Sequence, residues 1–509
     1  MSDTTGGQQF YSALQAKAMA ALKDILKSPL YPIQFPSQGD FFWYYQNPNQ
    51  VFNQSTFDYI SANISPGDVP GTAKLSNSGG FPNAYNQVIS SIVFTLSTND
   101  QAALNKAQSD AQTQGQTIVA DFQTSYGQIT DAQLQDAATK YGQYLVGNKI
   151  DYIISVVLGA QWSGNQAANK PPLSYQQMVN ARNLQDLLPY SPPGADQVIS
   201  DVSIYLNIMK PVIGLKTQIQ NGSWIIVQLQ NNTKAPSDSN GGIKTVNPNT
   251  GNVLSNLQVG YSISQSQAAI QNDLDSNKTI SFGMTTSQAS GGSVNVSIEG
   301  QAGFSVGSWL TFATTAGGSY DMSKSQGTST DASITLTWKG YSVVPMAPTA
   351  WQQATNVGWY YTDPIAQAVN NGTQDVTGFK FVTKPAYDLQ PFAKGGNFGL
   401  LNNLVISNYP TISITYKNAN FSSFKQSWNQ SVSGNLKLFG FIELGSFSQG
   451  AYGSSYQEGA DNSTFTVTFS ASEQVLSVPQ LQKTAYVIGG AVTNPGVTSS
   501  QQVEQLVSV

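Results

Sequence analysis

Two aspartates lie beside aromatic runs, where they could take part in acid–base chemistry on a sugar. Asp40 precedes Phe41–Tyr45, and Asp363 follows Trp359–Tyr361. A glycosidase needs two carboxyl groups at a defined separation and no histidine. An aspartate in such a position is more often a cap of a helix or a turn, and no spacing in this sequence requires a catalytic pair. We therefore assign no catalytic residue and expect a protein that is not an enzyme.

Carboxylates could also bind calcium. Asp273, Asp275 and Asn277 offer oxygen atoms at alternate positions, as in the first half of a helix–loop–helix calcium site. Lys278 stands where such a loop needs glycine, and Met284 stands where it needs a bidentate glutamate. We interpret the segment as a turn, and we expect no metal site and no cofactor.

The absence of histidine and cysteine excludes further chemistry. Without them the chain has no Ser–His–Asp triad, no thiolate nucleophile and no disulfide framework. Charged residues make up only 10% of the chain, against about a quarter in an average domain. The net charge is -5, and Arg182 is the only arginine. Because phosphate binding draws on clustered lysine and arginine, we expect no nucleic-acid partner.

Glutamine, asparagine, serine and threonine carry most of the polarity. A surface of this kind changes its charge little at acid pH, and it is poorly protected against association. Lineage composition or an acidic exterior would also produce it. Among these explanations, association predicts a homo-oligomer.

The first ten residues, MSDTTGGQQF, lack the basic start and apolar run of a secretory signal. The most apolar long stretch, 144–160, is short for a spanning helix and contains Lys149 and Asp151. We expect an extracellular or cell-surface protein that is exported without a recognisable signal peptide. A cytoplasmic location stays open.

Apolar periodicity predicts the order of the elements. Helical spacing predicts helices over 10–27 and from Thr98 onwards, and the capping box Thr130–Gln133 predicts a further helix start. From about Lys210 the period changes to two, and Trp224–Leu229 is predicted to be a strand. The fold class is therefore α+β, an N-terminal helical region followed by a larger antiparallel β-rich region.

The β-rich part contains two similar series of segments. Alternating residues 257–263 precede a glycine-rich stretch and Ile334–Trp338, and residues 412–416 precede a second such stretch and Phe465–Phe469. This order predicts an internal duplication of a β unit. The predicted domains are 1–195, mainly helical with an aromatic Asn/Gln-rich loop, 196–350 with the first β unit, and 351–509 with the second.

Two aromatic clusters are set among asparagine and glutamine. Exposed rings of this kind stack on sugars or anchor protein interfaces, whereas buried rings form ordinary core. The candidates for an interface or for ligand stacking are Phe41, Trp43, Tyr44, Tyr45, Trp359, Tyr360 and Tyr361.

Residues 293–299 and 333–338 alternate apolar side chains with small polar ones. A membrane β-hairpin needs this alternation over strands of about ten residues, although any half-buried strand shows it as well. The candidates for a membrane or assembly hairpin are Val294, Val296, Ile298, Ile334, Leu336 and Trp338.

Three functions are consistent with these features. The first is a non-enzymatic, self-associating structural or surface protein that assembles through low-charge β-rich surfaces. The alternative is a pore-forming toxin whose Ser/Thr-rich alternating hairpins insert into membranes, so that its partner would be a membrane. A weaker alternative is a carbohydrate-binding protein that uses the aromatic clusters.

Overall fold

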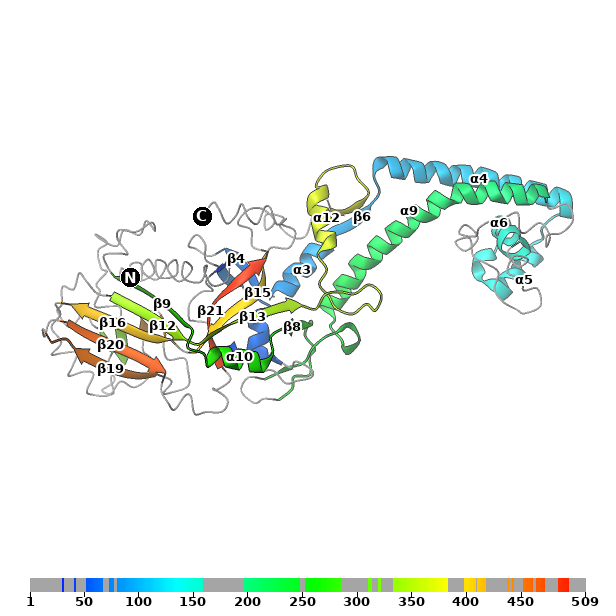
Figure 1. The fold of residues 1–509 in the computed structure, drawn as a ribbon. Coiled ribbons are helices and arrows are strands. Elements are labelled where there is room, and N and C mark those ends of the chain that lie inside the picture. The colour runs from blue at the N-terminus through cyan, green and yellow to red at the C-terminus, as the bar shows by residue number, and fades with distance from the viewer. Residues whose placement is uncertain are drawn as a thin grey trace. The chain divides into compact units, whose positions relative to one another are not determined.

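The structure of the protein is a computed structural model. It describes residues 30–31, 41–42, 52–66, 73–76, 80–158, 196–247, 252–285, 310–313, 319–321, 333–382, 398–408, 410–417, 437–438, 442–443, 452–460, 464–471 and 484–493. In these residues helices dominate the first half of the chain and antiparallel sheets the second, which confirms the α+β class (Figure 1). The helix predicted over 10–27 and the alternating segment 293–299 lie outside the described residues.

The chain forms two compact units that are discontinuous in sequence. The first unit comprises Met1–Ile92, Val227–Val369 and Val382–Val509, and the second comprises Val93–Ile226 and Asn370–Phe381. The predicted three-region division at 195 and 350 stays a prediction.

The second unit is mainly helical. Its elements, some of which extend into the first unit, are β6 (Ile92–Thr95), α4 (Thr98–Tyr126), α5 (Asp131–Tyr141), η1 (Gln143–Leu145), α6 (Lys149–Asp151), the π-helix η2 (Tyr152–Leu158), α9 (Asp196–Lys234) and β14 (Gly378–Phe381). The helix α12 (Asp363–Asn371) belongs mostly to the first unit, and only its last two residues lie in the second. The predicted helix from Thr98 is α4, and Ser97 caps it by accepting a hydrogen bond from the Asp100 backbone. Thr130 and Gln133 form the predicted capping box of α5.

Apolar stripes of α4 and α9 meet in the core of this unit. Ile118 and Phe122 of α4 pack with Val202 and Leu206 of α9, all of them buried. Burial of such side chains is the main favourable term in folding, and the polar faces of both helices stay exposed.

The prediction of a strand at Trp224–Leu229 is wrong, because these residues lie inside α9. Ile226 and Leu229 are buried, whereas Trp224 and Val227 are 38% and 47% exposed. Buried positions three residues apart follow helical spacing, and the run of apolar residues concealed it. Pro211 also lies within this helix.

The first unit holds the remaining elements. Its helices are α2 (Gln54–Ile60), α3 (Gly80–Ser90), the 3-10 helix η4 (Asp238–Asn240) and α10 (Gln267–Leu274). Its strands are β1 (Leu30–Tyr31), β2 (Phe41–Phe42), β3 (Phe52–Asn53), β4 (Asn63–Pro66), β5 (Ala73–Ser76), β7 (Thr245–Val246), β8 (Tyr261–Ile263), β9 (Thr279–Thr285), β10 (Leu310–Ala313), β11 (Ser319–Asp321), β12 (Ser333–Lys339), β13 (Tyr341–Pro348), β15 (Leu400–Ser407), β16 (Thr411–Lys417), β17 (Lys437–Leu438), β18 (Ile442–Glu443), β19 (Tyr452–Glu458), β20 (Thr464–Ala471) and β21 (Thr484–Thr493).

Two large antiparallel sheets are connected by four segments of the chain, which we call paths, and each path contributes one strand to each sheet (Figure 1). One sheet has the order β1-β21-β15-β13-β8, with β2 also paired to β21, and the other has the order β19-β20-β16-β12-β9. The chain passes from β8 through α10 to β9, from β12 to β13, from β15 to β16, and from β20 to β21. The strands of these four paths therefore stand in the same order in both sheets.

The predicted duplication takes the form of two adjacent hairpins. In the five-stranded sheet β9 pairs with β12, β12 pairs with β16, and β16 pairs with β20. The alignment of 257–263 with 412–416 is wrong, because β8 belongs to the six-stranded sheet. The counterpart of β16 is β9, which follows the insertion of α10. In β9 the apolar residues Ile280, Phe282 and Met284 alternate with Thr279, Ser281 and Gly283, and this alternation is the sequence signal that identifies β9 as the counterpart.

Candidate functional site

Trp359 lies in an aromatic cluster of the first unit. Its side chain is 1% exposed, and its ring centroid is 5.4 Å from that of Tyr85 and 5.6 Å from that of Tyr261. The indole Nε1 donates a hydrogen bond of 2.7 Å to the carbonyl oxygen of Gly260. The ring therefore packs in the core, and its polar atom already has a partner.

Tyr360 and Tyr361 are partly buried neighbours of this cluster. Burial raises the pKa of Tyr360. The hydroxyl of Tyr361 donates a hydrogen bond of 2.6 Å to Oδ2 of Asp363, and this bond, together with burial and the charge of Asp363, raises the pKa of Tyr361 to about 12. Asp363 is the first residue of α12, a position where a carboxylate favours a helix start.

The other aromatic candidates are described only in part. Phe41 lies in β2, opposite Ala485 of β21. Trp43, Tyr44, Tyr45 and the neighbouring Asp40 lie outside the described residues. Within the described residues, the structure therefore does not show whether the aromatic run 41–45 lies near Trp359.

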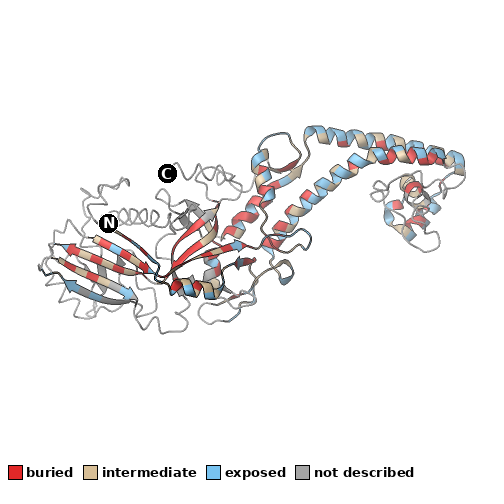
Figure 2. Cartoon of the chain, in the orientation of Figure 1, coloured by how far each residue is buried: buried red, intermediate tan, exposed pale blue. Residues whose placement is uncertain are grey.

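The hairpin candidates lie in β12 or outside the described residues. Ile334, Leu336 and Trp338 are all buried, on one face of β12, while Thr335 and Lys339 on the other face are exposed (Figure 2). The alternation predicted for this strand is confirmed. Val294, Val296 and Ile298 lie outside the described residues.

The two hairpins β9–β12 and β16–β20 open toward the same end of the sheet. Ser333 is opposite Thr285 on one side and opposite Thr415 on the other, and Lys417 is opposite Thr464. The chain leaves the first hairpin for residues 286–332 and the second for residues 418–463. Both hairpins therefore carry connections of nearly equal length at this end.

One face of this sheet is a ladder of hydroxyl groups. The side-chain oxygens of Ser281 and Thr337 are 2.9 Å apart, and those of Thr415 and Thr466 are also 2.9 Å apart. The opposite face is apolar and is formed by Ile280, Phe282, Ile334, Leu336, Trp338, Ile412, Ile414, Tyr416, Phe465 and Val467. The strands β9, β12, β16 and β20 thus each have the polar and apolar faces that a β-barrel wall in a membrane requires.

The two connections also pair with each other. β10 of the first connection pairs with β17 of the second, so that β11-β10-β17-β18 form a four-stranded sheet. Leu310 is opposite Leu438, and Thr311 is opposite Lys437. The two connections therefore pair with each other through these short strands.

Gly340 joins β12 to β13, at the boundary of the two large sheets. Its φ is +76°, a left-handed conformation that favours glycine. Its N–H donates to the carbonyl oxygen of Lys278 at 2.7 Å, and its own carbonyl accepts from the Ser407 hydroxyl. Asn408 donates to the carbonyl oxygens of Leu274 and Lys339 at 2.8 and 2.9 Å. These bonds tie three of the paths together where they change sheets.

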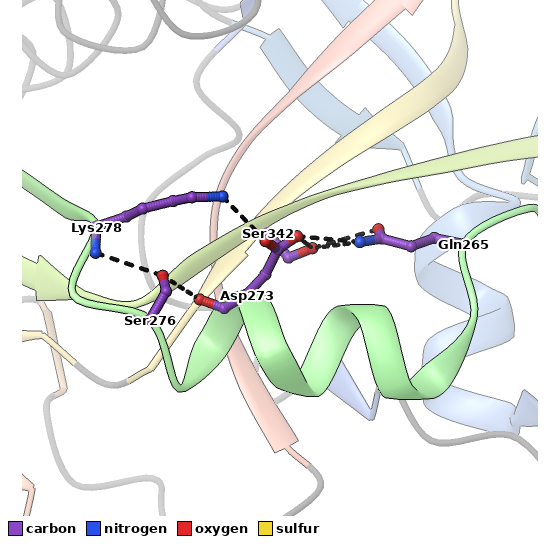
Figure 3. A network of polar contacts seen from close by, with 5 residues as sticks. All are labelled: Gln265, Asp273, Ser276, Lys278 and Ser342. Carbon is purple, nitrogen blue, oxygen red and sulfur yellow. Dashed lines mark hydrogen bonds and ion pairs between the residues drawn. The ribbon is translucent and has the colours of Figure 1, made fainter.

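A network on α10 fixes this helix against the boundary (Figure 3). Asp273 Oδ1 is 3.0 Å from Lys278 Nζ, and Oδ2 accepts hydrogen bonds from Ser342 at 2.9 Å and from Gln265 at 3.1 Å. Ser276 donates to the backbone carbonyl of Asp273 at 2.6 Å. We call the network of Gln265, Asp273, Ser276, Lys278 and Ser342 the α10 latch. The sequence pattern gave Asp273 only as part of a turn and did not indicate the latch, because Ser342 is remote in sequence.

Opposing effects set the charge state of the latch. Burial raises the pKa of Asp273, but the hydrogen bonds from Lys278 and Ser342 and the charge of Lys278 outweigh it and hold this pKa below its ordinary value of 3.8. Asp273 is thus a carboxylate at neutral pH, and the latch is an ion pair with satisfied hydrogen bonds.

A pocket of about 710 Å³ lies elsewhere in the first unit. Its wall is partly apolar, with Phe57 and Val259, and partly polar, with Asp58, Asn86 and Lys234. Asn86 donates to the carbonyl oxygen of Gln230 at 3.2 Å. The pocket has the mixed character of a small-molecule site, and Trp359 and Tyr361 are not part of its lining.

Metal ligation and membrane spanning are two further properties of the described residues. These residues contain no group of three or more acidic residues, histidines or cysteines that could hold a metal ion. One of their helices, α9, is long and apolar enough to cross a membrane by length and composition, and 39% of its most apolar window is buried within the protein. A helix that contributes a buried stripe to a core passes the same test, as α9 does here.

No protein-family model, no curated protein and no solved structure matches this chain. The functional proposal therefore rests on the sequence and on the geometry of the chain itself.

Proposed function

We propose that this protein forms pores in membranes by assembling with further copies of itself. In this proposal the hairpins β9–β12 and β16–β20 of each copy lengthen into the adjoining connections and become strands of a shared β-barrel. The observation that carries the proposal is the placement of two hairpins side by side in one sheet, each with a long connection at the same end. It includes the self-association expected from the low-charge composition.

The connections are long enough for this role. A β-strand crosses a bilayer with about 9–11 residues, so that one hairpin needs about twice that number and a turn. Each of 286–332 and 418–463 exceeds this requirement. Strands that lengthen from β9 and β12 keep the register of the existing hairpin, so that no new pairing has to be found.

Their composition also suits a transfer from water to a membrane. Glycine, serine and threonine are abundant, and the charged residues are Glu299, Asp321, Lys324 and Asp331 in the first connection and Lys425, Lys437, Glu443, Glu458 and Asp461 in the second. Val294, Val296 and Ile298 alternate with polar residues, and in a barrel they would face lipid while the polar side chains face the lumen. The same polarity keeps such segments compatible with water before insertion.

Release of a dye from vesicles tests this function. The full chain is added to vesicles of phosphatidylcholine, phosphatidylserine and cholesterol loaded with calcein, between pH 5 and pH 8, and the products are viewed by electron microscopy. The proposal predicts dye release and ring-shaped oligomers on the vesicles. Oligomers without release would favour the purely structural assembly protein, and a monomer that releases nothing would contradict both.

A further inference from the structure

The strand β19 does not belong to the four paths that run through both sheets. β9, β12, β16 and β20 each continue into a strand of the six-stranded sheet, whereas β19 lies at the edge of the five-stranded sheet and is part of the second connection. Seven of its residues pair with β20, from Tyr452 opposite Ala471 to Glu458 opposite Phe465. β19 therefore covers the outer edge of β20 with chain that the proposed function assigns to a membrane hairpin.

Strand direction shows why this cover matters for assembly. Neighbouring strands of the sheet are antiparallel, so that β20 runs opposite to β9 and β19 runs in the same direction as β9. In a ring every copy has the same orientation, and the edge strand of one copy meets the opposite edge strand of the next. With β19 in place the two edges would be parallel, whereas without it β20 and β9 would be antiparallel.

Membrane β-barrels are built from antiparallel strands, and in barrels of single chains their number is even. The four strands β9, β12, β16 and β20 supply an even number from each copy, and β19 makes the number odd. The sheet as it stands therefore cannot continue into the next copy with uniform antiparallel pairing.

The strand β9, at the opposite edge of the sheet, lacks the features that usually prevent pairing with another chain. β9 has no charged residue and no proline, and its seven pairs with β12 follow one unbroken register. Natural edge strands usually carry charges, proline or bulges that prevent pairing with other chains. In the described part of the chain no strand pairs with the outer side of β9. Such an edge fits a β-strand of a second copy.

We propose that β19 is a removable cover, and that its departure lets β20 of one copy pair with β9 of the next. This inference rests on the proposed function, because the membrane hairpin draws its second strand from the chain that includes β19. Insertion and assembly are coupled as a result. A copy whose second connection has left β20 offers an edge to its neighbour, and a copy that retains β19 stays a monomer.

A disulfide across β19 and β20 tests the inference, because the chain has no cysteine of its own. Ser455 is opposite Thr468, and the double variant Ser455→Cys/Thr468→Cys places two cysteines at neighbouring positions. Oxidised protein is predicted to lose oligomer formation and calcein release on the same vesicles, and reduction with dithiothreitol is predicted to restore both. Recovery on reduction shows that the variant is folded.

The matched control is Ser281→Cys/Thr337→Cys, which links β9 to β12, a pair that stays together in the assembled barrel. This variant is predicted to assemble and release dye whether oxidised or reduced. Equal assembly of the oxidised 455–468 variant would overturn the role of β19 while leaving pore formation in place. A third outcome is that the unmodified protein forms oligomers on the vesicles without releasing dye, while the oxidised 455–468 variant forms no oligomers. This outcome would support pairing of β20 with β9 between copies and would contradict pore formation.

Discussion

Gly340 passes so close to Leu274 that no side chain fits between them. A Cβ atom on residue 340 would lie 1.8 Å from the carbonyl oxygen of Leu274, which is far inside van der Waals contact. Leu274 is the last residue of α10, and Gly340 is the single residue between β12 and β13. The helix therefore packs directly on the backbone where one hairpin crosses from one sheet to the other.

Gly340→Ala is expected to lower the free energy of unfolding by more than the cost of its dihedral angle. An alanine with a positive φ costs about 1–2 kcal/mol, and the contact with Leu274 adds to that cost. The control is Gly147→Ala, since Gly147 has a φ of +68° and no atom within 4 Å of its Cβ position. Urea unfolding of both variants measures the difference, and equal losses would contradict the close packing at Gly340.

The α10 latch is expected to restrain the hairpins. Asp273→Asn removes the ion pair with the half-exposed Lys278 and should lower stability by about 0.5–1 kcal/mol. If the latch holds α10 over the boundary, calcein release should also become faster. Asp275→Asn at the C-cap of the same helix is the control, because the Asp275 carboxylate accepts an exposed hydrogen bond from Gln271 and forms no ion pair within the described residues. If the Asp273 variant is destabilised but releases calcein at an unchanged rate, the latch contributes to stability and does not restrain insertion of the hairpins.

The latch also has a defined pH dependence. The folded-state pKa of Asp273 is lowered, so that its contribution to stability is present above about pH 4 and is lost as the pH falls through the folded value. The difference in midpoint between wild type and Asp273→Asn should thus persist from pH 7 to pH 5 and shrink below pH 4. A difference that stays constant at acid pH would argue against an ionised Asp273.

Two buried tyrosines are expected to respond oppositely to loss of their hydroxyl. The Tyr85 hydroxyl donates to the Tyr361 carbonyl oxygen and accepts from its N–H, both at 2.9 Å. The Tyr261 hydroxyl is buried and has no partner in the described part of the chain. Tyr85→Phe should cost about 1–3 kcal/mol, while Tyr261→Phe should be neutral or stabilising. Denaturant unfolding compares them, and equal costs would refute the assigned bonds.

Asp151 is expected to make the helical unit less stable at neutral pH than in mild acid. Burial raises the pKa of Asp151 to about 6, against the effect of its hydrogen bond from Asn148. A carboxyl group with a raised folded pKa lowers stability as the pH rises from about 4 to about 6. Asp151→Asn should therefore gain about 1–2 kcal/mol at pH 7, after allowance for partial exposure, and nothing at pH 4.

Melting curves followed by circular dichroism at both pH values measure this gain. Asp136→Asn is the control, because its exposed pair with Lys140 contributes little. A gain for Asp151→Asn that is equal at pH 4 and pH 7 would show that the carboxyl group is not the cause.

Local patterns predicted the elements that local physics determines. The capping box at Thr130 and the alternation of Ile334, Leu336 and Trp338 depend on residues close in sequence, and both are present in the structure. The strand prediction for Trp224–Leu229 is wrong because a run of apolar residues satisfies a strand and a helix equally, and the burial of Ile226 and Leu229, three residues apart, is apparent only in the structure. Long-range packing is not visible in such a window.

The candidate site depended on contacts that no window contains. The adjacency of β12 and β16 joins residues far apart in the chain, and it alone shows that the two glycine-rich connections leave the same end of one sheet. Gly340 could have been singled out as a glycine between two alternating strands, a common place for a bend. Because α10 lies between β8 and β9, the sequence alignment matched β8, and not β9, with β16 of the second β unit.

The central claim is that the alternating connection becomes a barrel wall. Val296→Lys places a charge on the predicted lipid face, where a lysine at the midplane costs about 2–4 kcal/mol, whereas Asn295→Lys places the same charge on the predicted lumen face. Both variants add one positive charge, so that they have the same net charge as each other, and the two substituted positions are adjacent in the sequence. Each is therefore the control for the other.

Calcein release from the vesicles, measured for both variants beside the unmodified chain, is the most direct test. The account predicts that Val296→Lys loses release and that Asn295→Lys retains it. Equal release by the two variants, or loss in Asn295→Lys alone, would contradict a β-barrel formed by this segment.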